Sequence, residues 1–141
     1  HAKDRRQRQM CIRDSHVAGQ VRNGTTKGID ENALAAYNAP FPDDDHKQGV
    51  RQFPNLVPGT PRTPSAEPNK EAWKILREWK KPFLCAFSDK DPIFSGVENS
   101  FYKLIPGCKD MPHVTIEDAG HFLQEDQPEA CVDAILSIKD I

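Results

Sequence analysis

The fold is decided by residues 82–122, which read PFLCAFSDKDPIFSGVENSFYKLIPGCKDMPHVTIEDAGHF. Residues 82–87 form a short, continuously apolar run flanked by charge, which is typical of a strand buried on both faces of a parallel sheet. Residues 113–117 are rich in β-branched side chains and stop at Asp118-Ala119-Gly120, as a second strand would. A helical pattern over residues 97–104 lies between them. This order predicts parallel strands with covering helices, an α/β arrangement.

Amphipathic patterns extend this arrangement on both sides. The helix predicted before the first strand starts near Pro68, and its apolar residues recur at helical spacing: Ala72, Ile75, Leu76 and Trp79. After the second strand, Asp126 with Glu129 three residues later resembles a capping box, and it predicts the start of a final helix.

The upstream part, residues 16–60, is predicted to hold one helix followed by turns and short irregular pieces. A helix start with acidic first-turn residues is expected over residues 30–37, and two prolines end it. Residues 46–51 have room for one or two helical turns before Phe53-Pro54 interrupts them. The proline-rich residues 58–68 read as a linker or surface loop.

Composition narrows the function classes. The chain has 141 residues, a formal net charge of −2 and 28% charged residues. The near-zero charge argues against a nucleic-acid binder, and no apolar run approaches the roughly 18 residues of a membrane span. The four cysteines have neither the spacing of a metal site nor that of a redox pair: Cys11, Cys85, Cys108 and Cys131. We therefore expect a soluble, cytoplasmic protein without a metal site.

Residues 1–15 differ from the rest, with five Lys or Arg against two Asp. A basic arm that touches an anionic partner is one interpretation, and a signal peptide is excluded because no apolar region follows the charges. The stretch RQRQMCIRDS also resembles a string produced by sequencing-adapter read-through. We favour that interpretation and leave this segment out of the fold prediction.

Charged side chains follow both predicted strands at their carboxyl ends, where parallel sheets gather their chemistry. Asp91 follows the first strand and His121 follows the second. An imidazole exchanges a proton near neutral pH, and a carboxylate facing its other nitrogen fixes the tautomer. Either residue alone is more typical of a solvated turn. Their placement on successive strand ends predicts that they form an acid–histidine pair.

At these residues the sequence resembles a known family. FSDKDPIFSG followed by IEDAGHFLQEDQPE is similar to the C-terminal end of α/β-hydrolases, and AAYNAPFPDDDHKQGVRQFPNLVP (residues 35–58) resembles the end of the cap domain of haloalkane dehalogenases. The resemblance implies the C-terminal part of an α/β-hydrolase fold, a parallel sheet with flanking helices, preceded by the end of a helical cap domain. Residues 16–60 would then belong to the cap and residues 61–141 to an incomplete core.

The resemblance also implies residue roles. Asp91 would orient the histidine, and His121 would be the general base that activates water. The residues implied to contact the apolar halogenated substrate are Phe53, Pro54 and Val57 in the cap and Ile93 and Phe94 after the acid. Ordinary packing between cap and core is the alternative for these five.

Three positions depart from the family pattern or have no role in it. Ser88 stands where the family often has glycine, and His46 stands where a tyrosine is common. His113 has no implied role, so we expect both His46 and His113 to be surface residues.

The family reaction uses an aspartate nucleophile and water, with no cofactor. No G-x-D-x-G or G-x-S-x-G elbow occurs in these residues, so the nucleophile would precede this C-terminal fragment. Trp73 and Trp79 match no halide ligand and are expected to pack a helix onto the sheet. We therefore expect the chain alone to be inactive.

Three alternatives stay open. An epoxide hydrolase shares the aspartate nucleophile and the Asp/His pair but needs cap tyrosines, which Tyr37 and Tyr102 do not settle. An esterase or lipase would carry serine on the elbow. A non-catalytic interaction module with its own fold is the third alternative. The oligomeric state is not readable from the sequence.

Overall fold

The computed structural model describes residues 17–138, so the interpretation of residues 1–15 lies outside the described part. The described chain forms two compact units. The first holds the residues up to Asn23 and Ile29–Glu71, and the second holds Gly24–Gly28 and the residues from Ala72 onward. No helix within residues 17–138 is long and apolar enough to cross a membrane.

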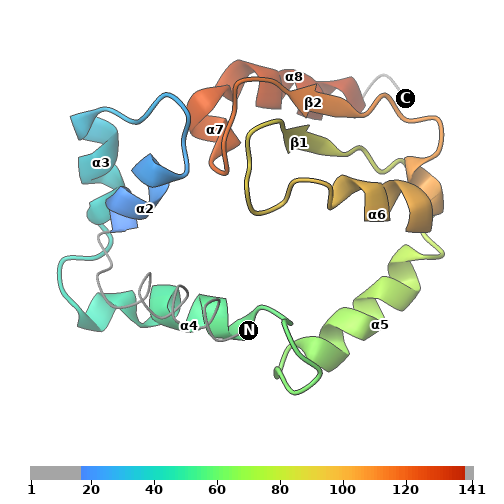
Figure 1. The fold of residues 1–141 in the computed structure, drawn as a ribbon, viewed down its shortest axis with the longest axis horizontal. Helices are drawn as coiled ribbons and strands as arrows, with labels where there is room; N and C mark the ends of the chain where they lie inside the picture. The colour runs from blue at the N-terminus through green and yellow to red at the C-terminus, as the bar shows by residue number, and fades with distance from the viewer. Residues whose placement is uncertain (1–16, 139–141) are drawn as a thin grey trace. The chain divides into compact units, whose positions relative to one another are not determined.

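The described residues of the first unit form helices joined by turns, with no strand among them. Its elements are α2 (Val17–Asn23), α3 (Glu31–Asn38), the 3-10 turn η1 (Asp45–Lys47), α4 (Gln48–Leu56) and the first half of α5 (Ala66–Leu76). Figure 1 labels the four α-helices. The prediction of a single helix here is wrong. The Asp30 carboxylate does cap α3 as expected, because it accepts the Ala33 N–H at 2.9 Å.

Helix α4 continues through Pro54, where the sequence predicted an interruption. Pro54 lies in the last turn, and the side-chain amide of Asn55 donates to the Arg51 carbonyl at 3.2 Å. At the start of the helix, Arg51 and Lys47 both pair with the Asp44 carboxylate, at 3.2 and 3.1 Å. These local polar contacts support the helix on both sides of the proline.

The second unit is built on two parallel strands, β1 (Ala86–Ser88) and β2 (Val114–Ile116). Ala86 pairs with Val114 and Ser88 with Ile116, so the two strands end side by side. The predicted parallel pair is confirmed, although each strand is shorter than the apolar pattern indicated. Ser88 ends β1 with no positive φ angle, so the backbone does not require the glycine that the family often has at this position.

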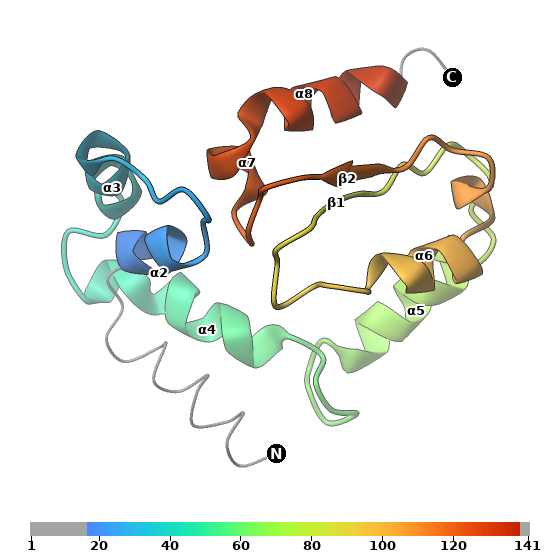
Figure 2. The ribbon, with the colours of Figure 1, turned by 45° about the horizontal axis from the view of Figure 1, so that its top comes forward.

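Helices lie on both sides of this strand pair, α8 (Pro128–Ser137) on one and α6 (Glu98–Leu104) on the other (Figures 1 and 2). A short helix, α7 (Leu123–Asp126), precedes α8 and was not predicted. The capping-box prediction is wrong, because Gln127 is the N-cap of α8 and caps it with no side-chain hydrogen bond. The α5 helix ends at Leu76, so Trp79 lies beyond it.

The core of the second unit is the buried cluster of Cys85, Ile105 and Cys108. Trp73 of α5 packs against this cluster and stacks on Phe101 with ring centroids 5.7 Å apart, which agrees with the packing role expected of it. Burial, together with the neighbouring Cys108, raises the pKa of the Cys85 thiol to about 12. Cys85 is therefore a buried hydrophobe, not a nucleophile.

His113 is half-buried and is not the surface residue that the sequence suggested. Its Nδ1 accepts the Cys85 N–H at 3.1 Å, and its Nε2 donates to the Cys108 carbonyl at 2.9 Å. The Tyr102 ring covers it with a centroid distance of 4.4 Å. His113 therefore joins the start of β1 to the 3-10 turn η2 (Pro106–Cys108) as a neutral imidazole. His46 is exposed, as expected.

Candidate active site

The structure brings Asp91 and His121 together beyond the carboxyl ends of β1 and β2. The Asp91 Oδ2 and the His121 Nδ1 lie 3.0 Å apart, a hydrogen-bond distance. Asp91 is 7% exposed, and its other oxygen accepts the Ile93 N–H at 2.7 Å. The carboxylate is thus fixed on both oxygens and presents one of them to the imidazole.

The imidazole of His121 is held between aromatic rings. Phe94 stacks on it at 5.4 Å with an interplanar angle of 26°, and Phe122 meets it edge-on at 5.1 Å. Because Nδ1 faces Asp91, the proton of the neutral ring lies on that nitrogen, and Nε2 is left as the acceptor. Within residues 17–138 no group hydrogen-bonds to Nε2. In this tautomer, Nε2 carries the lone pair that is able to accept a proton.

Burial of Asp91 works to raise its pKa, but the hydrogen bonds from His121 and from the Ile93 N–H outweigh that effect and lower it. The carboxyl group is consequently ionised at neutral pH. An ionised Asp91 stabilises the imidazolium that forms when Nε2 takes a proton.

The loops that carry these two residues are joined along their length. The Asp89 carboxylate accepts the Ala119 N–H at 3.1 Å, and the Lys90 N–H donates to the Ala119 carbonyl at 3.0 Å. The Lys90 ammonium also pairs with the Asp118 carboxylate. Asp118 adopts a left-handed backbone angle of 55°, which turns the chain out of β2. The pairing of the strands therefore continues through the loops to Asp91 and His121.

Asp126 is a buried carboxylate near this site for which the sequence predicted only a helix-capping role. It is 3% exposed, and its carboxylate accepts the N–H groups of Thr26, Lys27 and Gly120 at 2.8 to 3.0 Å. Burial works to raise its pKa, but the hydrogen bonds from Gly120, Lys27 and Thr26 outweigh this and lower it. No local pattern predicts such contacts, since Thr26 lies 100 residues away in sequence.

The other predicted site residues are distributed over the two units. Phe94 contacts His121, whereas the side chain of Ile93 is 62% exposed. Phe53 and Pro54 lie on α4 of the first unit and Val57 follows it, with Phe53 72% and Val57 48% exposed. A substrate-binding role for these five residues stays a prediction.

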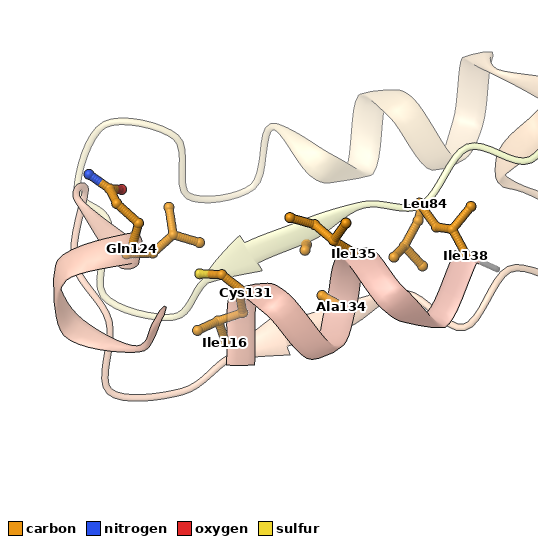
Figure 3. Close-up of a pocket in the computed structure, with 9 residues that line it drawn as sticks. Leu84, Ile116, Gln124, Cys131, Ala134, Ile135 and Ile138 are labelled. Atoms are coloured by element: carbon orange, nitrogen blue, oxygen red, sulfur yellow. The ribbon is translucent and has the colours of Figure 1, made fainter. Parts of the chain in front are cut away.

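An apolar groove lies elsewhere in the second unit, beside α8 (Figure 3). It is lined by Leu84, Ala86, Ile116, Leu123, Gln124, Cys131, Ala134, Ile135 and Ile138. Neither Asp91 nor His121 lines it, so the groove is separate from the acid–histidine pair.

Parallel strands that place an acid and a histidine at their carboxyl ends are the arrangement of an α/β-hydrolase. No family model matches the sequence. Among curated proteins, the chain is 50% identical over 114 residues to the haloalkane dehalogenase of Psychrobacter cryohalolentis and 41% identical over 114 residues to that of Mycolicibacterium paratuberculosis. The haloalkane dehalogenase of Mycobacterium marinum is 39% identical over 117 residues.

These matches cover 81 to 83% of this chain but only 38 to 39% of each relative. The chain therefore spans about two-fifths of the length of the curated relatives. Over that length, the resemblance to haloalkane dehalogenases is confirmed.

Proposed function

We propose that this chain supplies the acid and the base of a haloalkane dehalogenase, an enzyme that hydrolyses carbon–halogen bonds of small apolar substrates. The observation that carries the proposal is the 3.0 Å contact between Asp91 and His121 at the ends of adjacent parallel strands. The similarity to proteins named haloalkane dehalogenase supplies the substrate class. In this proposal, residues 16–60 are the end of a cap and residues 61–141 belong to the hydrolase core.

The reaction has two steps. An aspartate outside these 141 residues displaces halide from the substrate carbon and forms an alkyl ester, and no proton moves in that step. Water then attacks the ester carbonyl while His121 Nε2 takes a proton from it. The alcohol leaves, and the nucleophile is restored as a carboxylate.

Asp91 serves the second step in two ways. It keeps the proton of the neutral ring on Nδ1, so that Nε2 is free to act as the base. Its charge then stabilises the imidazolium that results. The rings of Phe94 and Phe122 restrict rotation of the imidazole between these states. No metal or organic cofactor takes part in this mechanism.

A chimaera tests the proposal. The 114 matched residues of this chain replace the corresponding segment of the Psychrobacter cryohalolentis relative, and halide release from a short bromoalkane is measured. We expect the chimaera to turn over and its His121→Gln variant to lose at least about 100-fold in rate, the usual minimum for a lost general base. His46→Gln, the same change at an exposed histidine, is the matched control and should leave the rate unchanged. Equal rates for His121→Gln and His46→Gln would refute the proposal.

Two further observations separate this function from its alternatives. The 141 residues contain no nucleophile elbow, so we expect the isolated chain to release no halide above the buffer background. An aspartate elbow encoded upstream of these residues would support the dehalogenase, and a serine elbow there would favour an esterase and contradict it.

A further inference from the structure

We propose that Asp126 is a positioning residue for His121: its carboxylate fixes the backbone that aims the imidazole at Asp91. This inference rests on the proposed function, because the aim of the ring matters when His121 acts as a base. It assigns a role to a buried carboxylate that takes no part in the reaction steps described above.

The contacts of Asp126 are directed at peptide N–H groups. Its two oxygens lie 3.0 and 2.9 Å from the Thr26 nitrogen, one of them lies 3.0 Å from the Lys27 nitrogen, and Oδ2 lies 2.8 Å from the Gly120 nitrogen. The Lys27 ammonium donates to the Asp126 backbone carbonyl at 2.7 Å, and among residues 17–138 no ion pair to the Asp126 carboxylate accompanies it. Its buried charge is therefore compensated by backbone donors, and charge-assisted bonds of this kind are short and directional.

These contacts hold the chain on both sides of His121. Gly120 directly precedes the histidine and donates to Asp126, while Phe122 directly follows it and donates its N–H to the Gly24 carbonyl at 3.2 Å. Gly24 belongs to the segment Gly24–Gly28, which Asp126 itself holds through Thr26 and Lys27. One carboxylate thus fixes both neighbours of His121, the first directly and the second through this segment.

The packing of the segment is tight. A Cβ atom on Gly120 would approach the Gly24 carbonyl oxygen closer than 3.0 Å, so the backbone of the histidine loop lies directly on the segment. The Thr26 hydroxyl adds a hydrogen bond to the Asp118 carbonyl at 2.8 Å. Without the Asp126 carboxylate, the loop that carries His121 and the segment Gly24–Gly28 would be free to move relative to each other. A displacement of about 1 Å is enough to impair a catalytic contact.

The experiment uses nitrogen NMR of the 141-residue chain with labelled histidine. Ring-nitrogen shifts report whether the His121 proton stays on Nδ1, and a His121→Gln variant assigns the signals. Asp91→Asn defines the spectrum of a lost acid–histidine pair. Asp126→Asn removes the carboxylate with little change in volume, and Asp133→Asn makes the same change at an exposed site on α8 as the matched control.

We expect Asp126→Asn to keep the dispersed amide spectrum of the second unit while its His121 signals move to those of Asp91→Asn. Asp133→Asn should match the wild type. Wild-type His121 signals in a folded Asp126→Asn chain would overturn the positioning role and leave the proposed function intact. Wild-type signals that already match Asp91→Asn would contradict the acid–histidine pair, and with it the proposed function and this inference.

A second variant covers the case in which Asp126→Asn does not fold. Asp126→Glu keeps the charge and both oxygens but moves them by one methylene. If it folds with displaced His121 signals, the positioning role is supported, and if it folds with unchanged signals, the role is overturned. Unfolding of both variants would make Asp126 a general stabilising residue and would also overturn the role.

Discussion

Substitution of Gly120 by alanine should destabilise the second unit and do so through the segment Gly24–Gly28. The new Cβ would lie closer than 3.0 Å to the Gly24 carbonyl oxygen, and ordinary contact begins at 3.4 Å. The obstacle is backbone and cannot rotate away as a flexible side chain would. The segment must therefore move, and the hydrogen bonds that hold it must lengthen.

The expected loss of unfolding free energy can be added up from these contacts. Forcing an extra carbon into a packed site costs about 1–3 kcal/mol. The bond from the Phe122 N–H to Gly24 contributes about 1 kcal/mol, and the charge-assisted bond from Gly120 to Asp126 contributes about 1.5–3 kcal/mol when fully lost. The lower unfolded-state entropy of alanine returns about 0.4–1 kcal/mol. With the Asp126 bond only weakened, the net loss is about 3 kcal/mol.

Urea unfolding followed by tryptophan fluorescence measures this loss. Both tryptophans, Trp73 and Trp79, lie in the second unit, so the fluorescence reports its unfolding. With a slope of about 1.5 kcal/mol per molar urea, the midpoint should fall by about 2 M. Gly49→Ala is the control, because nothing lies within 4 Å of its Cβ and it belongs to α4 of the first unit. A Gly120→Ala midpoint equal to that of Gly49→Ala would refute the reasoning.

Three other predictions concern the effect of pH on stability, the reactivity of two thiols and the bridge made by His113. The fold lowers the pKa of Asp126 below its ordinary 3.8, so the stabilisation from this carboxylate is complete above that pH and is lost as the pH falls through the lower native pKa. Between about pH 6 and pH 3, the urea midpoint should therefore fall less steeply in Asp126→Asn than in the wild type, and equal slopes would contradict this. The buried Cys85 thiol, with a pKa of about 12, should resist alkylation at about pH 8 until the chain unfolds, whereas the half-buried Cys131 should react earlier. Peptide mass spectrometry locates the label, and equal alkylation rates would contradict the burial of Cys85. His113→Phe should lower the unfolding free energy of the second unit by at least about 2 kcal/mol, because it leaves the Cys85 N–H and the Cys108 carbonyl without their partner. The same change at the exposed His46 should have no such effect, and equal urea midpoints for the two variants would show that the two hydrogen bonds of His113 contribute nothing.

The sequence allows the centre of the second unit to be predicted because the relevant patterns are local. A continuous apolar run and a β-branched run, separated by a helical pattern, predict two parallel strands, and the structure has them as β1 and β2. Since parallel strands end at the same edge, polar residues such as Asp91 and His121 that follow them are expected to lie close together, and they do.

The supporting contacts are not predictable in the same way, because they join residues far apart in the chain. Asp126 followed by Glu129 reads locally as a helix cap, but in the structure Asp126 binds Thr26, 100 residues away. The strand pattern of residues 113–117 says nothing of the side-chain partners of His113, yet this residue joins Cys85 to Cys108. For Asp126, tertiary hydrogen bonds take the place of the local role that the spacing suggested.

The continuation of α4 through Pro54 has a different cause. The rule that proline ends a helix reflects a missing N–H and a steric clash, and both matter least in the last turn. Pro54 lies in that turn, and the Asn55 amide donates to the Arg51 carbonyl there. A proline in the last turn therefore leaves the helix before it intact.

The central claim is that His121 activates the water of the second step and takes no part in halide displacement. Rapid-quench measurement of halide release by the His121→Gln chimaera tests it most directly. The mechanism predicts a burst of about one halide per protein molecule, after which release stops because the ester accumulates. Continued turnover at the rate of the unsubstituted chimaera, or no halide release in the first turnover, would contradict the claim.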